Sequence, residues 1–186
     1  MSRPLLRSLA FALVLASAVP ALAQTPTPSP APPAVDPTDV ASPEAAIAAV
    51  YQTISGPAGT PRNWDRLRGV MAPNARFTAL HVVDGVVKVR SLTVEEYIAN
   101  AGPYFAKQGF YERGVLTHVN RWGHIETAAS PYESRHAPGE APFARGINQF
   151  RLYFDGKRWW VESIMWEDET TALALPADAN AALKAR

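Results

Sequence analysis

The chain has 186 residues, of which 47% are hydrophobic and 10% aromatic, a composition typical of one packed globular domain rather than a disordered chain. Its 18 basic residues nearly balance 17 acidic ones, which gives no electrostatic footprint for nucleic acid or an anionic membrane. Cysteine is absent, which excludes disulfides, thiolate catalysis and cysteine-ligated metals.

The first residues have the pattern of a removable export signal. Arg3 and Arg7 precede an apolar run over 9–19, and Ala21-Leu22-Ala23 has the small-x-small form of a signal-peptidase site. The run has 11 residues, fewer than the roughly 18 needed to span a bilayer. We therefore expect a signal peptide over 1–23, and a periplasmic or secreted protein with no membrane association after cleavage.

A proline-rich spacer is expected over residues 24–43. Seven of these twenty residues are proline, which removes backbone donors and favours an extended chain. A docking role for a proline-rich ligand is the alternative to a simple tether. We expect the folded domain over 44–170 and a C-terminal tail over 171–186.

Three helices are predicted from caps and apolar spacing. Ser42-Pro43-Glu44 opens the first, which Gly56-Pro57 stops. The second starts near Thr60-Pro61 and ends at Pro73-Asn74. Thr93 and Glu96 form a capping box for the third, over 94–107.

Alternating apolar residues predict a sheet of about six strands. The first two form a hairpin around Asp84-Gly85. The strands are expected over 75–83, 86–92, 110–120, 124–135, 145–154 and 157–167. The fold class is therefore α+β, with a curved antiparallel sheet wrapped around three helices to form a cone.

The last hairpin can be given a register. A two-residue turn at Asp155-Gly156 sets Asn148 opposite Ser163 on an apolar face. These two polar residues then hold a ligand oxygen or bond each other. The opposite face would expose Trp160 and Trp166 together with Ile147 and Ile164, which predicts a homodimer through the sheet.

Several segments resemble a bacterial branch of the nuclear transport factor 2-like proteins. They are Gly109-Phe110-Tyr111-Glu112, Trp122-Gly123-His124-Ile125, Ser130-Pro131-Tyr132-Glu133, the run 145–149, the run 155–160 and Trp166-Glu167. The resemblance implies a cystatin-like cone that encloses a ligand pocket, in a superfamily that includes ketosteroid isomerase and polyketide cyclases, with many dimers through the sheet. It implies no established reaction for this branch.

Candidate site residues follow from this plan. Glu112 and His118 share strand parity and could face the cavity together, so either is a candidate catalytic base, with Asn148 as a hydrogen-bond donor, because burial raises a carboxyl pKa. The alternative is a rim glutamate and a hydrogen-bonded strand histidine. Glu133 and Arg145 are expected to form a structural ion pair. The residues that would line a ligand pocket, or equally fill a core, are Trp64, Tyr104, Phe105, Tyr132, Asn148, Phe150 and Ser163.

Three functional hypotheses remain open. No metal cluster, phosphate loop or Ser-His-Asp order is found in the sequence, so no metal or cofactor is expected. The first hypothesis is an exported domain that binds a small apolar molecule. The second is an acid–base enzyme of the same fold, such as an isomerase, dehydratase or hydrolase. The third is a dimeric accessory or protein-interaction subunit.

Overall fold

The computed structural model of the protein describes residues 34–185, so the expected signal peptide and most of the proline-rich spacer lie outside the described residues. Within residues 34–185, no helix is long and apolar enough to cross a membrane. The elements in chain order are η1 (Pro37–Val40), α1 (Pro43–Ile54), α2 (Trp64–Val70), β1 (Met71–Val83), β2 (Val86–Leu92), α3 (Val94–Lys107), β3 (Tyr111–Gly114), β4 (Thr117–Trp122), β5 (Ile125–Arg135), β6 (Ala144–Phe154), β7 (Trp159–Asp168) and α4 (Ala177–Lys184).

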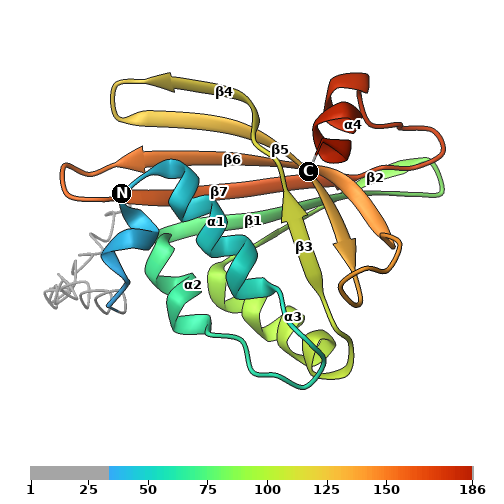
Figure 1. The fold of residues 1–186 in the computed structure, drawn as a ribbon, viewed down its shortest axis with the longest axis horizontal. Helices are drawn as coiled ribbons and strands as arrows, with labels where there is room; N and C mark the ends of the chain where they lie inside the picture. The colour runs from blue at the N-terminus through green and yellow to red at the C-terminus, as the bar shows by residue number, and fades with distance from the viewer. Residues whose placement is uncertain (1–33, 186) are drawn as a thin grey trace, which may run out of the picture. The chain divides into compact units, whose positions relative to one another are not determined.

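The strands form one seven-stranded curved sheet in the order β2-β1-β7-β6-β5-β3, with β4 paired to the other half of β5. The helices α1, α2 and α3 lie on one face, and α4 lies on the opposite face (Figure 1). The predicted α+β fold class is confirmed. Two details differ from the expectation: β1 and β7 pair in parallel, so the sheet is mixed, and the tail contains a fourth helix.

The helix starts follow local capping chemistry. The Ser42 side chain accepts from the backbone N–H of Ala45 at 3.1 Å, and Thr93 with Glu96 forms the predicted capping box. The second helix begins at Trp64 rather than near Thr60-Pro61, because Asn63 caps it by accepting from Arg66 N–H at 3.0 Å. The segment before Asn63 is held outside the helix by Arg62, whose guanidinium donates to four backbone carbonyls, those of Ile54, Gly56, Pro57 and Thr60.

The last part of the expected spacer is structured. Pro37–Val40 is a 3-10 helix capped by Asp36, and Val40 is buried in the core. Asp39 receives two hydrogen bonds of 2.7 Å from the Arg66 guanidinium. The expectation of an extended chain up to Pro43 is therefore wrong for these residues, because an apolar anchor and a partly buried ion pair fix them to α1 and α2.

The expected strand over 110–120 is two strands. β3 pairs with the second half of β5 and β4 with the first half. The break begins at Gly114, where an added Cβ would lie 2.3 Å from both the Tyr51 hydroxyl and the Ser130 hydroxyl. The chain approaches α1 so closely there that only glycine fits, and it resumes pairing past a β-bulge at which His118 has φ +48°.

The register predicted for the last hairpin is wrong. Phe154 pairs with Trp159, so the turn has four residues, and the Asp155 carboxylate accepts from the backbone N–H groups of Lys157 and Arg158. A bulge then leaves Glu162 unpaired. Beyond it, Asn148 pairs with Trp166 instead of Ser163, and Ser163 pairs with the exposed Arg151 on the outer face.

This shift also changes the surface expected to form a dimer. Ile164 is turned inward and is buried in the core. Ile147 faces outward, but Leu175, Ala179 and Leu183 of the C-terminal segment pack against it. The exposed group of Trp160, Trp166, Ile147 and Ile164 therefore does not exist, because a bulge inverts part of β7 and α4 covers part of the outer face.

Candidate functional site

An apolar cavity of about 240 Å³ lies between the inner face of the sheet and the helices α1 and α3. Its wall is largely aromatic, with a small group of polar side chains. The wall residues are Val50, Tyr51, Ile54, Phe77, Tyr97, Tyr104, Phe105, Phe110, Glu112, Tyr132, Ser134, Phe143, Ala144, Asn148, Phe150, Ile164, Trp166 and Asp168.

Glu112 is the central polar group of this cavity. One carboxylate oxygen accepts from Asn148 Nδ2 at 3.1 Å, and the other accepts from the Ser134 hydroxyl at 2.8 Å. Burial raises the pKa of Glu112 to about 7; the two hydrogen bonds oppose this rise, and the Asp168 carboxylate adds to it. Glu112 can therefore accept or release a proton near neutral pH.

Two further groups extend the polar cluster. Asn148 Nδ2 also donates to the Tyr51 hydroxyl at 3.0 Å, and Tyr51 is 2.7 Å from the Ser130 hydroxyl. On the other side, the Tyr132 hydroxyl donates to Asp168. Burial raises the pKa of both tyrosines, so both keep their protons at neutral pH.

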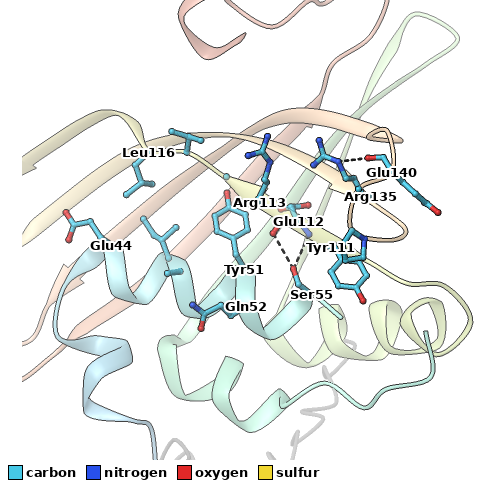
Figure 2. A pocket seen from close by; sticks show the side chains of 16 residues that line it. Glu44, Tyr51, Gln52, Ser55, Tyr111, Glu112, Arg113, Leu116, Arg135 and Glu140 are labelled. Atoms are coloured by element: carbon cyan, nitrogen blue, oxygen red, sulfur yellow. Dashed lines mark hydrogen bonds between the residues drawn. The ribbon is translucent and has the colours of Figure 1, made fainter. Parts of the chain in front are cut away.

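A surface groove of about 980 Å³ lies between α1 and β3, where Tyr51 and Glu112 separate it from the cavity (Figure 2). Tyr51 and Glu112 line both the groove and the cavity. The Ser55 hydroxyl receives the backbone N–H of Glu112 at 3.0 Å, which fixes the backbone of β3 against the end of α1. The strand that carries Glu112 is thus held from both sides, by β5 and by α1.

The structure brings most of the predicted pocket residues together. Tyr104, Phe105, Tyr132, Asn148 and Phe150 line the cavity with Glu112. Trp64 lies behind this wall, stacked on Phe105 with 6.1 Å between ring centroids.

Two predicted residues are not part of this cluster. Ser163 lies on the outer face because, beyond the bulge at Glu162, it pairs with Arg151. His118 lies on β4 with its side chain 70% exposed, and its Nε2 is 3.3 Å from a carboxylate oxygen of Asp178 in α4. The prediction that His118 and Glu112 face the cavity together is wrong, because the break between β3 and β4 separates them.

The cavity residues that the sequence does not single out include Tyr51, Ser134, Trp166 and Asp168. Tyr51 lies among the apolar residues on the buried side of α1, so the helical spacing gives no sign that its phenol joins a polar cluster. Trp166 and Asp168 were missed because the bulge at Glu162 decides which face of β7 they occupy. Ser134 directly follows Glu133 in β5, and successive strand residues point to opposite faces. An outward Glu133 paired with Arg145 is therefore the signal that could have placed Ser134 inside.

The predicted ion pair is present within a larger network. Glu133 and Arg145 pair across β5 and β6, with 3.8 Å between Oε1 and Nε. Glu133 also contacts Arg135 at 2.6 Å and Arg113 at 2.9 Å, and Arg145 contacts Glu169 at 3.1 Å. This network ties β3, β5, β6 and the end of β7 together outside the cavity.

The described residues offer no evident metal centre. Among residues 34–185, no group of three or more histidine and acidic side chains is arranged to hold a metal ion. The polar atoms of the cavity are instead bonded to one another, in a network of one carboxylate, one amide and several hydroxyls. The chemistry that these groups can perform directly is hydrogen bonding and proton transfer.

Comparisons with known proteins identify the fold. No protein-family model matches the sequence, and a search of curated proteins gave no significant match. Solved structures do match. A provisionally assigned calcium/calmodulin-dependent protein kinase type II association domain from Thiobacillus denitrificans is similar with a TM-score of 0.54 and 16% identity, over 69% of this chain and 96% of that one.

Two further neighbours agree. A nuclear transport factor 2-like protein of unknown function from Silicibacter pomeroyi has a TM-score of 0.50 and 14% identity, over 69% of this chain and 94% of that one. A provisionally assigned dehydratase described as belonging to the nuclear transport factor 2-like family, from Streptomyces avermitilis, has a TM-score of 0.50 and 16% identity, over 72% of this chain and 98% of that one. The chain therefore has the nuclear transport factor 2-like fold, as the resemblance implied.

Proposed function

We propose that the protein binds a small apolar molecule in the cavity, with one polar atom of the ligand directed at Glu112. The observation that carries this proposal is a mostly aromatic cavity with a single cluster of hydrogen-bonding groups. Apolar walls with a few convergent polar groups are the usual form of a ligand site. A volume of about 240 Å³ equals that of roughly eight waters, so the ligand is of single-ring size.

Thermal-shift measurements with small ring compounds test the proposal. Cyclohexanone, benzaldehyde and phenol are suitable probes, and we expect at least one to raise the unfolding temperature. Ala144→Phe would fill the space beside Phe143 and should abolish the shift. Ser163→Phe adds the same ring on the outer face and should leave the shift unchanged. No shift with any probe, or equal shifts for both variants, would contradict a ligand site in the cavity.

A second candidate function is proton transfer, and the carboxyl of Glu112 favours it. A carboxyl with a pKa of about 7 is a usable base at neutral pH. In this reaction, Glu112 takes a proton from a carbon next to a ligand carbonyl and returns it to the same molecule. Mass spectrometry of a bound ketone in D₂O measures the exchange. We expect exchange in the wild type and loss of it in Glu112→Gln; equal exchange in both would remove Glu112 from this role.

We also propose that the protein is exported, because residues 1–23 have the charge, length and cleavage pattern of a signal peptide. Intact-mass analysis of the protein from a native envelope fraction should give a chain beginning at Gln24. A full-length mass in that fraction would contradict the proposal.

A further inference from the structure

The strand β2 leaves one edge of the sheet uncovered. It is the terminal strand in the sheet order and pairs only with β1. Residues 86–91 are all exposed, and Val86, Val87 and Val89 are 52%, 57% and 64% exposed. A long apolar edge of this kind is a template for pairing with another strand, and most proteins cover or shorten it.

The turn determines which backbone groups of β2 are free. Asp84 and Gly85 have φ values of 52° and 75°, which makes a two-residue type I′ turn closed by Val83 and Val86. In such a hairpin, the closing pair and every second pair after it are hydrogen-bonded to each other. Val86, Lys88 and Arg90 therefore bond β1, while the N–H and C=O groups of Val87, Val89 and Ser91 point away from the sheet.

The two faces of this edge differ in charge. Val87 and Val89 pair with Val82 and Leu80, so the outer face is apolar. Lys88 and Arg90 pair with His81 and Ala79, so the inner face is cationic. Arg90 donates to the amide oxygen of Asn100 in α3, and neither Lys88 nor Arg90 forms an ion pair with a carboxylate among residues 34–185. Two cations at alternate positions are complementary to acidic side chains at the same spacing.

We propose that β2 is a docking edge for an extended segment of a partner protein in which acidic and apolar residues alternate. The backbone of that segment pairs with Val87, Val89 and Ser91, as in other complexes formed by strand addition. Its acidic side chains lie beside Lys88 and Arg90, and its apolar side chains lie beside Val87 and Val89. A second copy of β2 is a poorer occupant, because pairing two copies brings the cations of both strands together on one face.

Fluorescence anisotropy with a labelled peptide of alternating glutamate and valine tests this proposal on the full chain. We expect binding that weakens with salt, and no binding of the matching lysine–valine peptide. Val89→Pro removes one outward N–H without breaking a bond to β1, and should weaken binding roughly tenfold. Val89→Thr keeps the N–H but loses part of the apolar contact, so it should weaken binding less than Val89→Pro does.

A charge-reversal variant gives an independent answer if the proline variant unfolds. Lys88→Glu with Arg90→Glu should bind the lysine–valine peptide and lose the glutamate–valine one. The proposal is overturned if the wild type binds neither peptide, or if the charge reversal leaves the preference unchanged. It is also overturned if β2 instead mediates self-association, seen as a dimer by sedimentation that Val89→Pro converts to a monomer.

Discussion

Glu112 links the stability of the domain to pH. Its pKa is raised from the ordinary value of 4.5 to about 7, so the folded state binds more protons than the unfolded state between these values. The contribution of Glu112 to the free energy of unfolding is therefore greatest below about pH 4.5 and falls as the pH rises toward 7. A carboxyl that is buried in a cavity at this cost to its charged form is a candidate functional group.

Glu112→Gln should remove this pH dependence. The amide can accept from Asn148 and donate to the Ser134 hydroxyl, so the cavity hydrogen bonds are kept. We expect a gain of roughly 1–3 kcal/mol at pH 8 and little change at pH 4, measured by urea unfolding at both values. Ser163→Ala, outside the cavity, is the control. Parallel pH profiles for Glu112→Gln and wild type would show that Glu112 is not perturbed.

Asn148→Ala should destabilise the domain, and more strongly at high pH. It removes the bonds to Glu112 and to the Tyr51 hydroxyl, so the pKa of Glu112 should rise further. We expect stability to fall by about 1–3 kcal/mol, with a larger loss at pH 8 than at pH 5. Titration of the Glu112 carboxyl by NMR measures the pKa directly, and an unchanged or lower value would contradict the geometry.

At the scale of elements, the sequence predicts what is local and misses what depends on distant pairing. The caps at Ser42 and Thr93 and the hairpin at Asp84-Gly85 were predicted correctly, because neighbouring residues decide them. The bulge at Glu162 was not, because it also depends on parallel pairing with β1, whose register shifts between Met71 and Arg76. Glu112 could be placed near the cavity from strand parity, but His118 could not, since the break after Gly114 depends on contact with α1.

Asp155 organises the β6–β7 turn, and its removal should cost stability. Its carboxylate accepts from Trp160 Nε1 at 2.8 Å and from two backbone N–H groups, and these bonds lower the pKa of Asp155 to about 2. Asp155→Ala should cost roughly 1–3 kcal/mol at pH 7. Because the lowered pKa stabilises the fold only above about 4, the difference from wild type should shrink as the pH falls toward 2.

Asp155→Asn is the matched variant, since the amide oxygen can still accept from Lys157 and Arg158. It should lose less stability than Asp155→Ala in denaturant titrations at pH 7. Equal losses for the two variants would show that the charge, rather than the turn geometry, provides the stabilisation.

For the whole molecule, α4 controls access to the outer face of the sheet. Its residues Ala179 and Leu183, with Leu175 just before the helix, pack on Val115 and Ile147. Arg145 and His118 contact its polar residues Asn180 and Asp178. A homodimer through this part of the sheet remains a prediction, and it requires α4 to move aside. We expect truncation after Thr170 to promote self-association, measured by light scattering at micromolar concentration.

A point variant separates displacement of α4 from loss of the tail. Leu183→Asp places a charge at a buried contact and should release α4 while keeping the chain length. It should reproduce the higher mass of the truncated chain. Identical masses for the full chain, the truncation and Leu183→Asp would rule out shielding of a dimer surface by α4.

The bulge at Glu162 makes the inner wall of the cavity tolerant of a change in the length of β7 at this position. Val161 pairs with Leu152 and Ser163 with Arg151, so the surplus residue lies outside the ladder. A gene that lost the Glu162 codon would keep both pairs and would leave Ile164, Trp166 and Asp168 on the inner wall. An alignment with relatives that lack this residue therefore needs a one-residue gap in β7, because without it the alignment would compare residues from opposite sides of the sheet.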